Sequence, residues 1–511
     1  MKTLTRVGLT LSLTVSITGM AIDSYAQDQL RELSTQLRDG KTSAVQILKT
    51  YQERSAKLNP QLAAVIAMRA EATQDAEYAD KNRDAKLSLQ GLPLMLKDNI
   101  AVKGMATTAG SLALLENVAE NDAFIVTQLK AQGAIIVGKT NLSEWANFRS
   151  TKSTSGWSSV GGQTRNPYDL SKNTCGSSSG SGAAVAARMI PAAIGTETDG
   201  SIVCPAAMNG LVGLKPTLGL VSRSGIVPLS HSQDTAGPMT LTVTDAALIM
   251  NAIAGSDIHD PATKEADQRR SKDYRAGLNK EALKGLRIGV ASQLVKGYDQ
   301  ATLALFNASI AILKAQGAVI INGVTIPHLK QIEKDEFPVL LYEFKADLNH
   351  YLASTPSTVK SRNMAEVIRF NTEHAKQVMP YFGQEIMQLA QAKGPLTETT
   401  YIKALARAKK LAGPEGIDVA LKTHRLDALI APTTGVAWKI NYKKGDHITG
   451  SASSPAAIAG YPHLTVPMGL INGLPVGLSF FAGAWQDDVL LNMGYAFEQA
   501  RPALPAPNLA H

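Results

Sequence analysis

Cysteine is almost absent from this chain, and the usual patterns of metal ligands are missing. Cys175 and Cys204 are the two cysteines among 511 residues. No CxxC or HExxH motif occurs, and the nine histidines show no ligand spacing. We therefore expect no metal site. The sequence leaves open whether the two cysteines form a disulfide or remain buried thiols.

A basic stripe of the kind that binds nucleic acid is also missing. The formal net charge is +8, but the lysines and arginines are scattered along the chain, and aromatic residues make up only 5% of it. Proteins that bind nucleic acid typically cluster their basic residues. We therefore expect a solvated basic surface and no nucleic-acid partner.

Long hydrophobic runs are absent beyond the N-terminus. Lys2 and Arg6 flank an apolar stretch over residues 7–22, and residues 24–26 (Ser-Tyr-Ala) resemble a cleavage site. This pattern predicts a secretory signal peptide over residues 1–26, too short and too broken by polar residues to span a membrane. We expect a periplasmic or secreted protein that has no membrane insertion after the signal is removed.

No proline-rich or charged linker divides the remainder, so residues 27–511 are predicted to form one α/β domain. Amphipathic periodicity predicts two or three helices over residues 30–83 and a buried strand near 91–96. The segment LKAQGA at 129–134 recurs at 313–318, each time followed by a β-branched run. Helix, glycine stop and strand alternate as in α/β sheet proteins.

The remaining patterned segments agree with this class. Further helices are predicted at 336–352 and 401–411, and late core strands at 426–431 and 474–481. Residues 151–225 are unusually rich in Ser, Thr and Gly, and long ordered loops of this kind tend to be functional.

One serine-rich segment matches a nucleophile motif that its context does not support. Residues 176–180 (GSSSG) match GxSxG with Ser178 at the centre. That motif requires a strand that enters a strained turn, whereas the preceding residues 165–174 are turn formers. The context argues against an α/β-hydrolase, and no phosphate-binding glycine motif occurs either.

Two other parts of the sequence, Lys97 and residues 195–201, indicate a catalytic site only when they are considered together. Lys97 ends an apolar run, and a lysine buried there would have a pKa lowered toward neutrality, which makes it a usable base. Residues 195–201 (GTETDGS) form a small-residue turn whose backbone N–H groups point the same way, as in an anion-binding arc. Either element alone is more simply a surface lysine or a tight turn.

Together, Lys97 in a PLxxKD context, Ser177 in the glycine/serine loop and Ser201 in GTxxxGS resemble the amidase signature family. The resemblance covers nearly the whole mature chain. It is densest at residues 91–100, 138–240 and 426–500, and includes GKTN at 138–141, GLVGLKP at 210–216 and GLPVG at 473–477.

The resemblance implies a large mixed central β-sheet covered by α-helices on both faces, and hydrolysis of carboxamides through an acyl-serine. It assigns Ser201 as nucleophile, Ser177 as the bridging serine and Lys97 as base. The backbone N–H groups of Thr198, Asp199, Gly200 and Ser201 would hold the oxyanion. Neither a metal nor an organic cofactor is required.

Departures from the family pattern narrow the substrate. Asp199 stands where many members have glycine, so its carboxyl must point away or be paired. Val203 replaces a common arginine, which disfavours a small anionic substrate, and Ser179 replaces a common glycine. The segment GTETDGSIVCPA resembles the peptide amidase branch, so we expect hydrolysis of C-terminal peptide amides.

Three alternatives compete with peptide amide hydrolysis. One is a general amidase for small aliphatic or aromatic amides. Another is a protein similar to the glutamine-hydrolysing part of the tRNA-dependent amidotransferase, a role that an exported chain could not serve. The last is a non-catalytic periplasmic binding protein, against which the intact Lys97, Ser177 and Ser201 argue.

Overall fold

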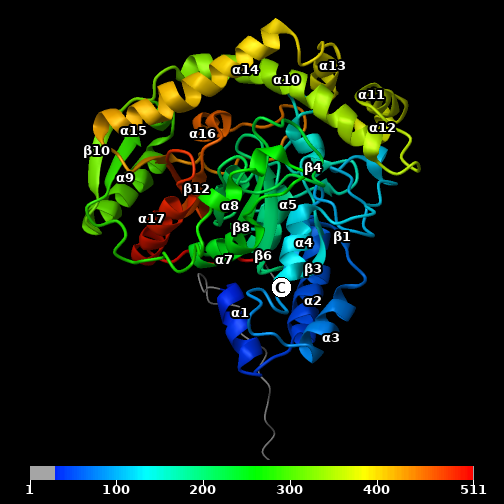
Figure 1. The fold of residues 1–511 in the computed structure, drawn as a ribbon, viewed down its shortest axis with the longest axis horizontal. Coiled ribbons are helices and arrows are strands. Elements are labelled where there is room, and N and C mark those ends of the chain that lie inside the picture. The colour runs from blue at the N-terminus through cyan, green and yellow to red at the C-terminus, as the bar shows by residue number, and fades with distance from the viewer. Residues whose placement is uncertain (1–28, 510–511) are drawn as a thin grey trace, which may run out of the picture.

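The computed structural model describes residues 29–509 and is built around one mixed sheet of 11 strands (Figure 1). The predicted signal peptide lies outside the described residues. Across the sheet the strands are β1 (Val65–Met68), β3 (Ile135–Thr140), β2 (Pro93–Lys97), β6 (Ala192–Glu197), β8 (Thr235–Thr240), β7 (Val212–Lys215), β12 (His463–Ile471), β13 (Leu474–Phe481), β11 (Ala428–Pro432), β9 (Arg287–Ala291) and β10 (Val319–Val324).

The sheet has a group of parallel strands toward each edge and antiparallel strands in the middle. β3, β2 and β6 run parallel to one another, and so do β11, β9 and β10. The middle strands from β6 through β8, β7, β12 and β13 to β11 pair antiparallel. Parallel neighbours end at the same edge of a sheet, so β2 and β6 bring their carboxyl ends together.

Helices cover both faces of the sheet, as predicted. α5 (Ser179–Ala186) and α6 (Val203–Met208) pack together on one face, whereas α4 (Phe124–Ala131), α7 (Val243–Ile253), α9 (Gln300–Ala315) and α17 (Asp487–Ala500) pack on the other. α6 and α17 both contact β12 and β13 but lie on opposite sides of them. The strands between are buried on both faces and read as continuous apolar runs.

The N-terminal segment, for which two or three helices were predicted, contains three: α1 (Gln29–Arg38), α2 (Ala44–Leu62) and α3 (Ala72–Lys81). It also contains a strand that was not predicted, because β1 lies between α2 and α3 and pairs antiparallel with β3. β1 has only four residues and is partly exposed at the sheet edge, so its sequence lacks the apolar run of a central strand.

A further layer of helices arches over the sheet (Figure 1). These helices are α10 (Leu329–Ser354), α11 (Met364–Glu373), α12 (Ala375–Val378), α13 (Glu385–Gln391), α14 (Thr399–Ala412), α15 (Asp418–His424) and α16 (Ser454–Ala459), while α8 (Ala266–Arg269) is a single turn elsewhere. Leu340, Phe344 and Leu348 of α10 form a second apolar core with Leu114 and Trp145. Burial of this cluster holds α10 over the loops that follow β2 and β3.

The alanine-rich segment at 183–189 predicts a helix, but α5 begins earlier, at Ser179, and ends at Ala186. Its first turn contains Gly180, where an added Cβ would lie 2.3 Å from the Ala64 carbonyl oxygen and 2.5 Å from the Asn141 nitrogen. Only glycine allows so close an approach between backbones. The small residues therefore let this loop pack tightly, as expected, although the helix starts earlier than its alanines suggest.

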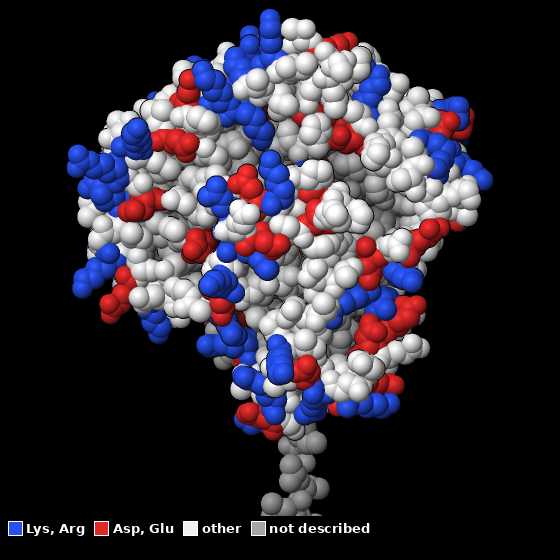
Figure 2. Space-filling view, viewed as in Figure 1, with Lys and Arg blue, Asp and Glu red and all other residues white. Residues whose placement is uncertain are grey.

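Charge and hydropathy of the described part add two observations. On the face in Figure 2, lysine and arginine side chains lie among aspartates and glutamates without a continuous basic stripe. No helix within residues 29–509 is both long enough and apolar enough to cross a membrane.

Candidate active site

Lys97 lies at the point where two parallel strands end side by side. It is the last residue of β2, and Thr196 stands near the end of the adjacent strand β6. The side chain is completely buried. Its Nζ lies 2.8 Å from Ser177 Oγ, 2.8 Å from Thr196 Oγ1 and 3.1 Å from the Thr196 carbonyl oxygen. The structure therefore brings together Lys97 and Ser177, which are 80 residues apart in sequence.

Burial lowers the pKa of Lys97 to about 7, although Asp234 and Glu197 partly oppose the change. No carboxylate makes a hydrogen bond to this amine among the described residues; its partners are hydroxyl groups and a carbonyl. Because a buried ammonium without a contacting counter-ion is costly, a large share of Lys97 is neutral at physiological pH.

The three contacts fit a neutral amine. A neutral amine has two N–H donors and one lone pair. The Thr196 carbonyl must accept an N–H, and Thr196 Oγ1, which also accepts from Asn99 Nδ2 at 2.9 Å, takes the second. The lone pair then faces the hydroxyl of Ser177. The geometry therefore lets Lys97 accept a proton from Ser177.

Ser177 and Ser178 have different surroundings, although both are fully buried. Ser178 Oγ donates to the Thr196 carbonyl at 3.0 Å and accepts the Thr196 N–H at 3.2 Å. Both functions of its hydroxyl are thus used to fix the end of β6. As predicted from the missing strand, 15 residues of loop and turn separate β5 (Gly162–Gln163) from α5.

The turn at 198–201 connects β6 to α6. Gly200 has φ +79°, a backbone conformation that favours glycine. Within residues 29–509, the N–H groups of Asp199, Gly200 and Ser201 donate no hydrogen bond. Ser201 is 8% exposed and its carbonyl accepts the N–H of Ser178 at 3.1 Å. The turn therefore presents free N–H donors beside a slightly exposed serine hydroxyl.

Glu197 holds the backbone directly after Ser201. Its Oε2 accepts the N–H of Ile202 at 2.7 Å and that of Val203 at 2.9 Å. These are N–H groups that the start of α6 leaves without an intrahelical partner. Lys215, also fully buried, lies close enough to lower the pKa of Glu197, although burial outweighs this effect and raises it. Sequence reasoning did not single out Glu197.

A cavity of about 350 Å³ opens onto this turn. Its lining combines the turn at 198–201 with Gly176, which precedes Ser177. Apolar side chains form another part of its wall, and serines of the loop before α16 form a polar part. The apolar contributors are Phe148, Leu229, Leu340 and Ile448, and the serines are Ser451, Ser453 and Ser454.

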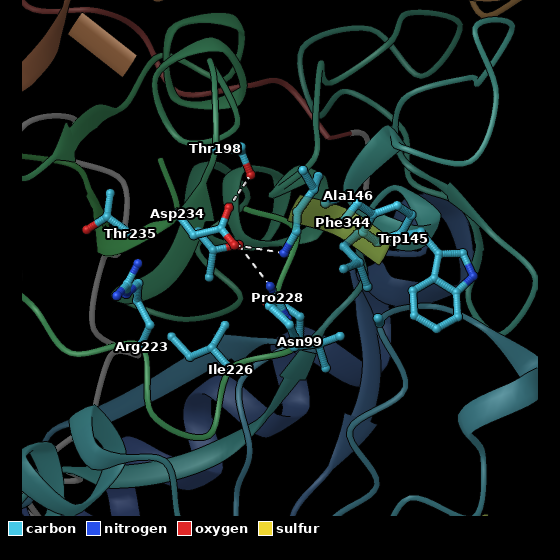
Figure 3. A pocket seen from close by; sticks show the side chains of 15 residues that line it. Asn99, Trp145, Ala146, Thr198, Arg223, Ile226, Pro228, Asp234, Thr235 and Phe344 are labelled. Atoms are coloured by element: carbon cyan, nitrogen blue, oxygen red, sulfur yellow. Dashed lines mark hydrogen bonds between the residues drawn. The ribbon is translucent and has the colours of Figure 1, made fainter. Parts of the chain in front are cut away.

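Asp234 lines a second, smaller cavity, where its carboxyl group meets the hydroxyl of Thr198 (Figure 3). It accepts the Thr198 hydroxyl at 2.6 Å and the Leu229 N–H at 2.7 Å, and burial raises its pKa to about 6. This second cavity has a volume of about 20 Å³, room for about one water molecule. Thr196, Asn99 and Asp234 were missed in the sequence because their partners lie far away along the chain.

Cys175 and Cys204 form a disulfide with a Cα–Cα distance of 5.9 Å, which answers the question left open above. Cys175 precedes Gly176 and Ser177, and Cys204 follows Ser201 in the first turn of α6. The bridge therefore joins the two serine-bearing segments, and both cysteines line the cavity.

One group of potential metal ligands occurs among the described residues, formed by His231, Glu343 and Asp347. None of the three lines the cavity. His231 Nδ1 lies 2.9 Å from Asp347 Oδ2, and Glu343 accepts hydroxyl groups of Ser232 at 2.8 Å and Tyr401 at 2.8 Å. These side chains already form hydrogen bonds with one another and with their neighbours. We therefore interpret the group as a hydrogen-bonded link between α10 and the loop that carries Asp234.

Comparison with known proteins places this geometry in a family. The model of the Amidase family matches residues 46–491. A probable amidase of Arabidopsis thaliana is 38% identical over 492 residues, which cover 93% of this chain and 90% of that one. The matching part of the glutamyl-tRNA(Gln) amidotransferase of Thermoanaerobacter pseudethanolicus is 33% identical, over 94% of this chain and 97% of that one.

A solved structure is more similar still. The native peptide amidase from Stenotrophomonas maltophilia is 48% identical and superposes with a TM-score of 0.90, over 94% of this chain and 98% of that one. On this evidence the chain belongs to the Amidase (amidase signature) family and is an amidohydrolase.

Proposed function

We propose that this enzyme hydrolyses the C-terminal carboxamide of peptides to a carboxylate and ammonia, with Ser201 as nucleophile, Ser177 as proton relay and Lys97 as base. The observation that carries the proposal is the buried amine of Lys97, whose Nζ lies 2.8 Å from Ser177 Oγ and whose pKa burial lowers to about 7. A serine hydroxyl is a weak nucleophile until a neighbouring base takes its proton.

In the proposed course, Ser177 gives its proton to neutral Lys97 and takes the proton of Ser201, whose oxygen then bonds to the amide carbon. The free N–H groups of Asp199, Gly200 and Ser201 stabilise the oxyanion, each such donor being commonly worth about 2.7–4 kcal/mol. The C–N bond breaks as the relay returns a proton to the nitrogen, which leaves as ammonia. Water then cleaves the acyl-serine by the same relay, which releases the carboxylic acid.

Two features support a peptide as the acyl group. The peptide amidase of Stenotrophomonas maltophilia is the relative with 48% identity, and the cavity of about 350 Å³ is roomy enough for more than a small amide. Its wall combines apolar side chains with serine hydroxyls and backbone, a lining suited to a peptide rather than to a small anion. The absence of arginine at Val203 agrees with this.

A panel of primary amides tests the proposal. We expect ammonia release from peptides with a C-terminal carboxamide at higher kcat/KM than from free glutamine or short aliphatic amides. Release from the small amides alone would instead favour the general amidase, and no release from any amide would contradict hydrolysis altogether. Preference for glutamine would favour a function similar to that of the amidotransferase.

The assignment of roles is tested with a fluorophosphonate probe and mass spectrometry. Ser201→Ala should abolish both labelling and ammonia release. Ser178→Ala should keep its label on Ser201, because the Ser178 hydroxyl is committed to Thr196. Loss of labelling in Ser178→Ala but not in Ser201→Ala would refute the assignment.

Export is part of the proposed function. The predicted signal peptide at 1–26 would direct the enzyme to the periplasm or the medium, and cleavage near Ala26 would leave an N-terminus at Gln27. Mass spectrometry of the enzyme from fractionated cells tests this. A cytoplasmic product that retains Met1–Ala26 would contradict it.

A further inference from the structure

The carboxyl group of Asp199 is paired rather than turned to solvent. Its Oδ2 accepts the hydroxyl of Ser454 at 2.7 Å. Its Oδ1 is buried and receives no N–H or hydroxyl hydrogen bond from residues 29–509. A second carboxyl group, that of Glu336 on α10, lies within hydrogen-bonding reach of the Asp199 side chain. Two carboxyl groups can share a hydrogen bond only if one carries a proton, because an ionised carboxylate has no donor.

Gln233 fixes the orientation of the Glu336 carboxyl group. Its Nε2 donates to Glu336 Oε1 at 2.8 Å and, at 3.3 Å, to the carbonyl of Thr198. Since Oε1 of Glu336 accepts from Gln233, its other oxygen is the one available to share a proton with Asp199. Glu336 and Gln233 thus bind adjacent residues of the 198–201 turn and connect it to α10.

The surroundings of Glu336 favour its protonated form. It is half-buried, and the acidic groups that face it are Asp199 from the turn and Glu333 from its own helix. Burial and the charge of Asp199 raise the pKa of Glu336 well above its ordinary value.

Cations on the neighbouring elements have other partners. On α14, Arg407 bonds to Asp335, and Lys409 donates to the carbonyl of Ser232. Lys215 of β7 is buried and interacts electrostatically with Asp199 and Glu197. Within residues 29–509, no lysine or arginine therefore forms an ion pair with Glu336.

We propose that Glu336 is a positioning residue for the hydrolysis: its carboxyl group stays protonated and donates to Asp199, which holds the free N–H groups of the 198–201 turn where the oxyanion forms. This inference rests on the proposed function. It also explains how an aspartate is tolerated at a position where many family members have glycine. If Glu336 lost its proton, its carboxylate and that of Asp199 would repel each other. This repulsion would displace the 198–201 turn.

Two substitutions of Glu336 distinguish the loss of its hydrogen-bond donor from the loss of its ionisable carboxyl group. Glu336→Gln keeps the shape and supplies an amide donor, so its kcat should stay within about threefold of the wild type. Glu336→Ala leaves Asp199 Oδ1 buried without a donor. Its kcat should fall about tenfold with little change in KM, less than the roughly hundredfold loss of a whole oxyanion donor. Glu373→Gln, at an exposed position at the end of α11, is the matched control and should match the wild type.

The proton itself is observed by infrared spectroscopy. At about pH 8 the carbonyl band of protonated carboxyl groups should be weaker in Glu336→Gln than in the wild type. The difference between the two spectra isolates Glu336, because other buried carboxyl groups whose pKa burial raises, such as Asp98, Glu144 and Glu197, are present in both proteins. This measurement remains decisive if Glu336→Ala fails to fold.

Equal kcat in Glu336→Ala and wild type, equal losses in Glu336→Ala and Glu336→Gln, or an unchanged infrared band would each overturn the inference. Its failure is distinguishable from failure of the proposed function. If no amide is hydrolysed, the rate of fluorophosphonate labelling at Ser201 replaces kcat. If Ser201 is not labelled either, the proposed function fails while the infrared band still tests the proton on Glu336.

Discussion

Lys97 and Lys139 are both completely buried and stand near the carboxyl ends of the adjacent parallel strands β2 and β3. Their partners differ. Lys139 Nζ lies 3.2 Å from Asp98 Oδ1 and 3.4 Å from both Ala106 O and Thr107 Oγ1. Lys97 makes hydrogen bonds only to neutral groups.

The difference shows how one sheet edge places an ion-paired lysine beside the lysine that we propose as base. Burial lowers the pKa of both lysines, but at Lys139 the charge and hydrogen bond of Asp98 oppose the change directly. At Lys97 the opposing carboxylates are not in contact, and the pKa falls to about 7. A counter-ion in contact favours the charged amine, whereas neutral partners leave the cost of burying the charge largely uncompensated.

The largest effect is expected at Lys97. Lys97→Met should lower kcat/KM about 10³-fold, since a positioned general base contributes roughly 10²–10⁴. The free energy of unfolding should not fall near neutral pH, because the native state no longer buries an amine whose pKa is depressed. That advantage should shrink as the pH rises toward the ordinary pKa of lysine. Steady-state kinetics and denaturant unfolding measure both, and activity within tenfold of the wild type would contradict the role of base.

Lys139→Met should show the reverse pattern. It leaves Asp98 buried without its counter-ion, so the free energy of unfolding should fall by about 3–5 kcal/mol. The kcat of the folded fraction should change little. The double variant Asp98→Asn/Lys139→Met removes both charges and should recover part of the stability. A loss below about 1 kcal/mol in the single variant would show that this ion pair is not a structural one.

The disulfide should affect stability without affecting the base. Cys175 and Cys204 are 29 residues apart, so replacing both with alanine should lower the free energy of unfolding by about 3–4 kcal/mol. The acid limb of kcat/KM against pH should remain near pH 7, because neither cysteine contacts Lys97. A displaced limb in this variant would mean that the bridge controls the environment of the lysine.

The smallest effect is a shift of that limb. In the wild type, kcat/KM should rise through about pH 7 as Lys97 loses its proton. The charge of Asp234 raises the pKa of Lys97, so Asp234→Asn should move the limb to lower pH, by roughly a few tenths to one unit. Asp84→Asn, at an exposed position, serves as control. A shift to higher pH would reverse the sign assigned to Asp234.

The sequence predicted the parts of the site that lie within short contiguous motifs. The segment GTETDGS identified the turn at 198–201, and the strand predicted at 474–481 matches β13. β1 escaped prediction because a four-residue edge strand with two exposed positions has no distinctive pattern. α5 begins on Ser-Gly-Ser-Gly, where tertiary packing rather than helix propensity decides.

The residues that orient the groups of the site could not be predicted from the sequence, for another reason. Thr196 becomes significant only when β6 pairs with β2, and Glu336 only when α10 crosses the 198–201 turn. The disulfide likewise depends on two loops that meet in space. Each role follows from a partner tens of residues or more distant, and no local pattern encodes such a partner.

The pH dependence of fluorophosphonate labelling, with the modified residue identified by mass spectrometry, tests the central claim most directly. If neutral Lys97 activates Ser201 through Ser177, the labelling rate should rise through about pH 7 in the wild type and in Lys139→Met. It should be lost in Lys97→Met, and the label should lie on Ser201. A label on Ser178, or a rate that persists in Lys97→Met, would contradict the account.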